Sequence, residues 1–481
     1  MDLETQFPNT VFRYRSIDAL LGERKELERR TIYFAPPELL NDPMEGFRQI
    51  YWKGDRITWG NLLRHYIICL YHRVLEALLS DDDKPLKHNS VAVFADLENL
   101  PTDAFKLRCK KCISKIEKGK LHKRLLKMLS SLDRNVGESE LGNYLGMVHI
   151  HWFAVVYNFI IEDGPTNGSK FKVPVPVRLP DVFNELERLT PQILEQQKDT
   201  TLEIISEIHQ SMNEQMNLIT AYNNNDDPKP KKDSLLFDFP SHYLKNLAKL
   251  IYPDWYVACF SKRPDNASMW SYYANNHDGC CLVFDIQNTN SRTTIQLNGP
   301  SGFSNRGITR RNKNYLLQEV NYHSDAQRAN FFTNIGNLST TKILNNWFKD
   351  QKGTLSPLAN YLGDEEHEKW HKQYWDDFSP PLLQKLSDWE HEQEQRIILI
   401  DNLGFYSSDE GRLFTYDHKA LKGIIFGKNV SFGNKLRIMR IMDDHLTGLP
   451  DVADFKFYQA NYDTRKRAIK ISELNLIQYS N

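Results

Sequence analysis

The sequence contains few cysteines, no excess of either charge and no long hydrophobic run. Six cysteines in 481 residues, at irregular spacing, exclude a disulfide framework and indicate a reducing compartment. The 61 basic and 62 acidic residues exclude a chain that binds polyanions over its whole surface. The N-terminus, MDLETQFPNT, lacks the features of a signal peptide, and the most apolar run, 147–161, is shorter than the ~20 residues of a membrane span. We therefore expect a cytoplasmic protein without a membrane partner.

Three common catalytic or nucleotide-binding strings are also missing. The sequence contains no GxGxxG, no GxxxxGK[ST] and no GxSxG. These absences argue against a dinucleotide-binding Rossmann fold, a P-loop and a serine-hydrolase elbow, because each needs its glycine-rich phosphate or nucleophile loop.

The periodicity of apolar residues predicts an α/β domain interrupted by a helical insertion. Residues 11–48 are typical of a strand, a helix, a strand and a capped turn, and strand-like runs return after residue 255 as WYVACF, CCLVFDI, LLQEVNY, RIILI, LKGIIFG, DFKFYQA and RAIKI. Between these regions the pattern is helical. We predict helical structure within 324–350 and mobility in the Asn- and Gly-rich stretch 287–314. The predicted parts are an N-terminal α/β segment at 1–56, the helical insertion at 57–222, a linker at 223–234 and a C-terminal α/β segment at 235–481.

Two segments place polar side chains near predicted strand ends. In LLNDPMEGF, residues 39–47, Asn41, Asp42 and Glu45 can cap a helix, or the turn can border a pocket and aim Asp42 or Glu45 into it. In CFS, Ser261 ends a predicted strand, where its hydroxyl can face a cleft. The aromatic residues that follow, Trp270 and Tyr273, have the spacing of core residues.

The segment WEHEQEQRIILI, residues 389–400, is unusually rich in acidic residues before a buried strand. A strand that begins near Glu390 would place Glu390, Glu392, Glu394 and Arg396 on one face. A carboxylate pair beside an arginine can tune acidity and orient a hydroxyl group. The alternative is a solvated edge in which Arg396 pairs with Glu394.

Two further patterns have both a functional and a structural interpretation. His367 and His371 form an HExxH string, which on a helix can bind zinc, but its surroundings are those of a charged, solvated helix. Residues 106–127 hold ten basic side chains and one Glu, and this face can bind nucleic-acid phosphates or simply be solvated.

Several segments together resemble the bacterial domain-of-unknown-function family 2971. They are VFRYRS, TIYFAPPELLNDPMEGF, CFS with MWSYYANNHDGCCLVFD, VNYH, WEHEQEQRI and LKGIIFG, and they cover residues 11–48 and 256 to about 471. The helical region 57–250 lies outside this resemblance.

A looser resemblance is to the arginine-serine-glutamate ADP-ribosyltransferases. Arg13 corresponds to the arginine of the first strand, Ser261 to the serine motif, and Glu392 and Glu394 to the Glu-x-Glu motif, although Tyr14 stands where a glycine is usual and the serine motif lacks its flanking Thr and Ser. The resemblance implies an α+β fold with a mixed sheet, NAD as substrate and no metal. It also implies roles for the matched residues. Glu394 stabilises the oxocarbenium-like transition state, Glu392 contacts the acceptor, and Ser261 orients the second carboxylate. The residues expected to contact NAD are Arg13, Tyr14, Asn41, Trp270 and Tyr273.

The leading hypothesis is therefore an NAD-dependent ADP-ribosyltransferase-like effector, a toxin or antiviral defence component, that modifies a protein or nucleic-acid acceptor. The helical insertion can mediate oligomerisation. Two alternatives remain open: a non-enzymatic ligand-binding or sensor protein that uses the same site, and a zinc hydrolase that uses His367 and His371.

Overall fold

The computed structural model describes most of the chain and divides it into two compact units. It describes residues 3–79, 91–94, 97, 102–131, 133–163, 211, 214–215, 218–219, 222, 235–289, 292–305, 307–323, 327–449 and 455–477. The first unit comprises residues 1–47, 254–326 and 377–481, and the second comprises residues 48–253 and 327–376. The predicted linker at 223–234 and much of the predicted insertion lie outside the described residues.

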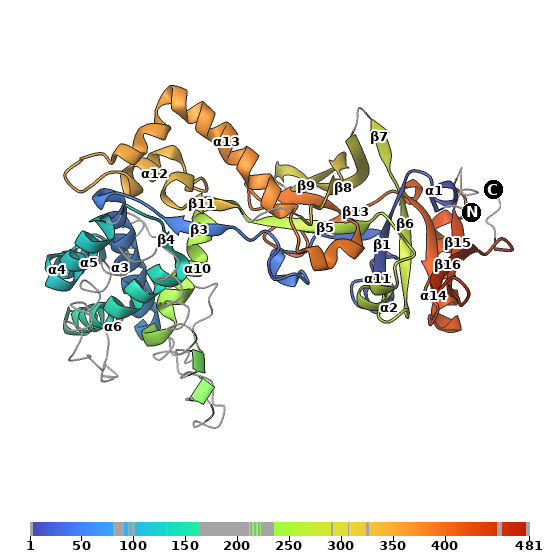
Figure 1. Cartoon of the computed structure of the whole chain (residues 1–481), viewed down its shortest axis with the longest axis horizontal. Coiled ribbons are helices and arrows are strands. Elements are labelled where there is room, and N and C mark those ends of the chain that lie inside the picture. Colours follow the sequence, from blue (N-terminus) through green and yellow to red (C-terminus); the bar gives the residue numbers. More distant parts are fainter. Residues whose placement is uncertain are drawn as a thin grey trace. The chain divides into compact units, whose positions relative to one another are not determined.

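The first unit contains most of the strands (Figure 1). Its elements are α1 (Leu3–Gln6), β1 (Thr10–Ser16), α2 (Ile17–Leu21), β2 (Thr31–Tyr33), η1 (Pro37–Leu39), β5 (Trp255–Ser261), α11 (Ala267–Tyr272), β6 (Gly279–Asp285), β7 (Gln287–Thr289), β8 (Arg292–Ser304), β9 (Gly307–Leu316), β10 (Gln318–Glu319), η6 (Ser387–Glu392), β12 (Glu394–Ile400), β13 (Leu413–Thr415), η7 (His418–Ala420), β14 (Leu421–Phe426), α14 (Phe432–Leu446), β15 (Lys456–Asp463) and β16 (Ala468–Glu473).

An eight-stranded sheet forms the centre of this unit, in the order β10-β12-β5-β1-β6-β14-β15-β16. Its named pairs are antiparallel except β14 and β15, which are parallel and are joined through α14, as a parallel pair requires a crossover. One face packs against α14 and a five-stranded sheet in which β2, β13, β8 and β7 follow one another and β9 pairs with β8. The other face packs against α1 and α11. Because both faces are covered, β5 and β6 are apolar along most of their length.

The second unit is mainly helical, with one small sheet. Its elements are β3 (Gln49–Trp52), α3 (Arg56–Leu79), α4 (Asp103–Lys118), α5 (Lys120–Ser131), β4 (Val136–Gly137), α6 (Glu138–Asp163), α10 (Phe239–Ile251), β11 (Arg328–Asn330), η4 (Phe332–Asn334), α12 (Thr340–Trp347) and η5 (Pro357–Leu362), while α13 (Asp364–Leu382) contains the boundary between the units. The small sheet has the order β11-β3-β4.

Helices α3, α6 and α10 share a buried aromatic core in the second unit. At its centre the Tyr66 hydroxyl lies 2.7 Å from Nδ1 of His149, and Nε2 of His149 lies 2.7 Å from the Leu235 carbonyl oxygen. By length and composition α6 could cross a membrane, but 56% of its most apolar window is buried in this unit, as expected of a core helix.

The mixed α/β character predicted from the sequence is confirmed. The helical prediction for 324–350 is confirmed in part, because this stretch contains η4 and the short helix α12 but also β11. The stretch 287–314 contains β7, β8 and most of β9, and its mobility stays a prediction. The predicted domain boundaries stay a prediction. The contact-based units are drawn elsewhere and place 48–56, 235–253 and 327–376 with the helical part.

Candidate functional site: a buried charge cluster

The candidate site lies in the first unit, where η6 leads into β12. The predicted strand from Glu390 is wrong, because residues 387–392 form a 3-10 helix closed by the Gln393 amide donating to the Glu390 carbonyl. Gln393 then adopts a left-handed conformation (φ 44°, ψ 54°), and the strand starts at Glu394. This turn leaves Glu390 exposed and directs Glu392 and Glu394 inward.

Five charged side chains meet there, and we call them the charge cluster: Glu45, Lys385, Glu392, Glu394 and Arg396. The ammonium group of Lys385 lies 3.1 Å from Glu45, 2.6 Å from Glu392 and 3.2 Å from Glu394. The guanidinium group of Arg396 lies 2.8 Å from Glu394 and 2.7 Å from Glu45. None of these side chains is more than 4% exposed. Three carboxylates and two cations give the cluster a formal charge of −1.

Neighbouring groups fix the cluster in position. The Tyr273 hydroxyl donates a hydrogen bond to Glu392 (2.7 Å), and the backbone amide of Glu394 donates to the Tyr322 hydroxyl (2.8 Å). The buried Asp42 carboxylate accepts from the backbone amides of Met44 and Leu386. Asp42 therefore ties the turn that carries Glu45 to the segment that carries Lys385, and its role is to hold this turn in place.

The surroundings of the three carboxylates give them different pKa values. Burial works to raise the pKa of Glu394, but Arg396 and then Lys385 outweigh it and hold that pKa at about 2. Burial raises the pKa of Glu392 and of Glu45, and the nearby cations only partly offset this effect. Burial also acts to lower the pKa of Lys385, but the three carboxylates raise it above its usual value. Glu394 is thus the firmly ionised member, and Glu392 and Glu45 are the members that gain a proton more readily.

Ser261 lies beside the cluster but does not touch its carboxylates. The β5–β12 register places Ser261 directly opposite Glu394. Its hydroxyl donates to the backbone carbonyl of Glu392 at 2.8 Å. In this structure Ser261 therefore does not bond to the second carboxylate, and its orienting role stays a prediction. The serine holds the backbone that leads into β12.

Arg13 lies on the opposite face of the sheet. Its neighbours Phe12 and Tyr14 pack in the core on the face that Ser261 shares, and alternation along β1 directs Arg13 to the other side. There the guanidinium group lies over the Phe260 ring and donates to the carbonyls of Cys259 and Tyr33, each at 3.2 Å. Arg13 is 8% exposed, so it does not share a binding surface with Glu394.

The other residues expected to contact NAD are divided between core and surface. Tyr14 and Trp270 are buried and pack edge to face with ring centroids 5.1 Å apart. Asn41 is exposed. Tyr273 alone among these residues contacts the charge cluster, and it is half-buried, so the Tyr273–Glu392 pair is the part of the site nearest to solvent.

The HExxH string does lie on a helix, α13, but the imidazole of His371 has another partner. Its Nε2 accepts a hydrogen bond from the Trp375 indole at 3.1 Å. Within the described parts of the chain, no three His, Cys, Asp or Glu side chains are grouped closely enough to hold a metal ion.

Two members of the site were not predicted from the sequence. Lys385 belongs to no recognisable motif, and Tyr322, although it lies in the segment VNYH of the family resemblance, was assigned no role. Glu45 was predicted to enter a site, but its partners Lys385 and Arg396 are distant in sequence and could not be foreseen.

Residues 269–397 match a known family. The match is to the model of the family described as Protein of unknown function (DUF2971). It supports the first resemblance drawn from the sequence and includes the cluster members Lys385, Glu392, Glu394 and Arg396, together with Tyr273 and Tyr322. Glu45, Ser261 and Arg13 lie outside the matched range. No curated protein and no solved structure matches this chain.

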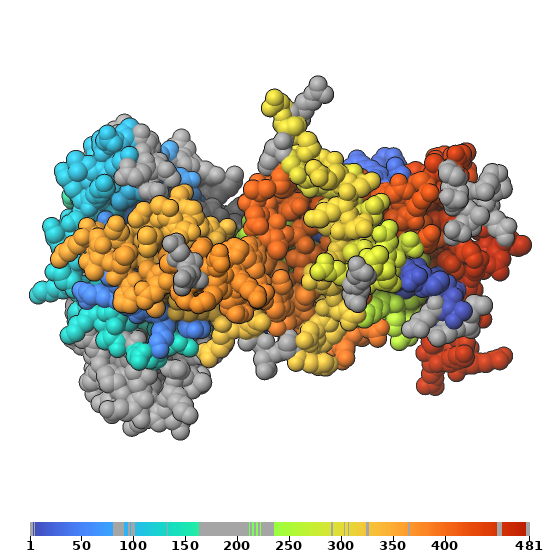
Figure 2. Space-filling model, turned by 90° about the horizontal axis from the view of Figure 1, so that it is seen from above, coloured from blue at the N-terminus to red at the C-terminus, as the bar shows by residue number. Residues whose placement is uncertain are grey.

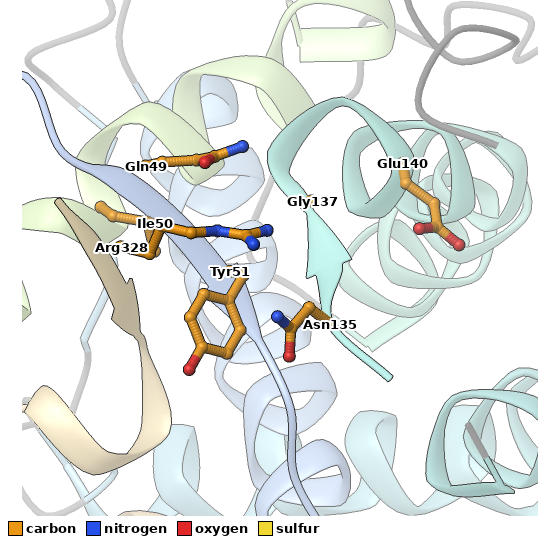
Figure 3. A pocket seen from close by; sticks show the side chains of 7 residues that line it. All are labelled: Gln49, Ile50, Tyr51, Asn135, Gly137, Glu140 and Arg328. Carbon is orange, nitrogen blue, oxygen red and sulfur yellow. The ribbon is translucent and has the colours of Figure 1, made fainter. Parts of the chain in front are cut away.

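A separate small pocket lies in the second unit (Figure 3). Its lining residues are Gln49, Ile50, Tyr51, Asn135, Gly137, Glu140 and Arg328. The Arg328 guanidinium lies 5.8 Å from the centroid of the Tyr51 ring, and the Glu140 carboxylate is paired with Arg134. The lining of this pocket contains a single acid, Glu140, whereas three carboxylates meet in the charge cluster, so the charge cluster is the stronger candidate for acid-base chemistry.

Proposed function

We propose that the chain is an NAD-consuming, ADP-ribosyltransferase-like effector whose carboxylate pair, Glu392 and Glu394, belongs to the reaction site. The main support is the arrangement of the strands that carry the three matched motifs. They are neighbours in one sheet, in the order β12-β5-β1, with Ser261 directly opposite Glu394. The three matched motifs are therefore close together in space, which is compatible with one shared site.

Because their pKa values differ, Glu394 and Glu392 have different roles in this reaction. The bond between nicotinamide and the ribose C1′ breaks, and nicotinamide leaves with the bonding electrons. A permanently ionised Glu394 stabilises the positive charge that develops on the ribose. The acceptor oxygen or nitrogen, or a water molecule, then bonds to C1′ and passes its proton to Glu392, whose pKa is raised.

The reaction requires a rearrangement of the cluster. Lys385 occupies the carboxylates that would face the ribose, at 2.6 Å from Glu392 and 3.2 Å from Glu394. A ribose hydroxyl must replace these contacts. Arg13 has no part in this version of the site, because it lies on the opposite face of the sheet, and no residue is assigned to the pyrophosphate.

Nicotinamide release from NAD tests the proposal directly. The purified full chain is incubated with NAD, with and without cell lysate, beside Glu394→Gln and the matched control Glu390→Gln, whose carboxylate is exposed on the same segment. We expect release that Glu394→Gln reduces by about 10²- to 10³-fold and that Glu390→Gln leaves unchanged.

A second variant tests whether a loss of activity could come from a folding defect. Tyr273→Phe removes only the hydroxyl that donates to Glu392, and we expect slower release with an unchanged melting temperature. Failure of the wild-type chain to release nicotinamide in either condition would overturn the enzymatic proposal.

The pairing of the carboxylates with Lys385 and Arg396 favours one alternative, in which the chain is a non-enzymatic sensor of NAD. In the described structure the cations already satisfy the carboxylates. Saturable NAD binding by calorimetry, without nicotinamide release, would identify this role.

A further inference from the structure

A second functional surface is formed by the helices α4 and α5 in the second unit. Seven lysines of these helices are exposed, and six of them form two rows: Lys111, Lys115, Lys118, Lys120, Lys123 and Lys127. On α4 the lysines are spaced at i, i+4 and i+7, and on α5 at i, i+3 and i+7, so each set lies on one side of its helix. The first and last lysine of each row are about 10 Å apart along the helix axis.

The lysines of these rows are not used in the fold. Their side chains form no hydrogen bond or ion pair with another residue that the structure describes. Between Lys106 and Lys127 the only acid is Glu117, and it is paired with Arg64 of α3. Cys112, Ile116 and Leu125 are buried beneath the rows, whereas Leu107, in the first turns of α4, is 56% exposed.

Helix stability does not explain this arrangement. Lys120 and Lys123 occupy the first turn of α5, which contains no acidic residue, and positive charge is unfavourable at the N-terminus of a helix. Like charges one turn apart on the same side also repel each other. The α5 row therefore costs stability, which is a mark of residues retained for binding, whereas Lys115 and Lys118 lie in the last turn of α4, where positive charge is favourable.

We propose that the lysine rows of α4 and α5 bind the phosphate backbone of a nucleic-acid duplex. The charge is complementary to phosphate, and no aromatic side chain lies among the rows to stack on unpaired bases. An anionic membrane fits less well, because the apolar side of both helices is buried and cannot insert into lipid. Figure 2 shows atoms of α4, in cyan, on the surface of the molecule. This inference is independent of the NAD chemistry.

The test measures binding of the full chain to a fluorescein-labelled 30-base-pair duplex, as DNA and as RNA, by fluorescence anisotropy between 50 and 200 mM NaCl. Six phosphate contacts predict a slope of about −5 in log affinity against log salt, which is a loss on the order of a thousandfold over this range. The triple variant K111Q/K115Q/K118Q should reduce the slope by about 3 and weaken binding at least about tenfold.

The control K249Q/K369Q/K372Q removes the same charge from exposed lysines of α10 and α13 in the second unit and should bind as the wild type does. Equal losses in the two triple variants, or a slope that K111Q/K115Q/K118Q does not change, would overturn the proposal. So would binding to vesicles of phosphatidylcholine and phosphatidylserine with none to either duplex.

Discussion

Substituting Lys385 by Met is expected to destabilise the first unit strongly. Met keeps the length and the apolar stem of the side chain but removes the charge that contacts three buried carboxylates within 3.2 Å. Removing one partner of a buried ion pair typically costs 3–5 kcal/mol, because the other charge stays buried without compensation, and we expect about that loss in the free energy of unfolding. For a unit of roughly two hundred residues this corresponds to a fall in melting temperature of about 6–20 °C.

The loss should depend on pH, with a sign that the carboxylates determine. Without Lys385, the pKa values of Glu45 and Glu392, which burial already raises, move further up. A group with a raised pKa in the folded state is most stabilising when it is protonated, so the variant recovers stability as the pH falls. We therefore expect a larger difference from the wild type at pH 8 than at pH 5.5 in thermal unfolding followed by circular dichroism.

The matched control is Lys369→Met, since Lys369 is exposed and pairs only along its own helix, with Glu366. It should melt as the wild type does. A drop of less than about 2 °C for Lys385→Met, equal at both pH values, would refute the reasoning that this ammonium group compensates the buried carboxylates.

Two further predictions concern local features of the structure. Gln393→Gly should raise the free energy of unfolding by about 0.5–1 kcal/mol, because glycine adopts the left-handed conformation without the steric cost that a side chain adds. Gln393→Val should lower the free energy of unfolding. Urea midpoints measure both changes. In the second unit, burial holds the pKa of His149 and of His122 at about 4, against about 6.5 in the unfolded chain. The unfolded chain therefore binds protons first, and stability falls as the pH drops from 6.5 toward 4, by roughly 2 kcal/mol per histidine at pH 5. His149→Gln should remove about half of this pH dependence in urea titrations at pH 7 and 5, and an unchanged dependence would contradict the assignment.

The central strands could be predicted from the sequence because both of their faces are buried. Runs such as WYVACFS in β5 and GCCLVFD in β6 are apolar up to their last residue, and their lengths exclude long helices. The β8–β9 hairpin was missed for the opposite reason. The residues of β9 are nearly all exposed, so neither face gives an apolar alternation, and only the pairing with β8 defines the strand.

The composition of the charge cluster could be predicted only in part. A local pattern revealed Glu392, Glu394 and Arg396, because they lie within five residues of each other. The strand-period argument failed at Gln393, where a single left-handed residue separates a 3-10 turn from the strand. Lys385 reaches the site through tertiary contacts that sequence spacing does not encode.

The position of Arg13 shows a further limit of motif matching. The strands that carry Arg13, Ser261 and Glu394 are neighbours in the sheet, yet alternation in β1 places Phe12 and Tyr14 on the face of Ser261 and Arg13 on the other. In any strand, successive side chains point to opposite faces of the sheet. Which face a given side chain occupies depends on the register of that strand with its neighbours.

The energetics of the charge cluster also bear on its role. Replacing a buried ionic network by well-packed apolar residues often leaves the stability of a protein unchanged or raises it. Stability alone is therefore a weak reason for five buried charges. The formal charge of −1 leaves the cluster short of one positive charge, and two of its carboxylates, Glu392 and Glu45, have raised pKa values for that reason and because they are buried. A cation that arrives transiently would restore neutrality without being held permanently. The positive charge that develops on a ribose as nicotinamide leaves has this property, and it would be stabilised next to Glu394 at the moment when it forms.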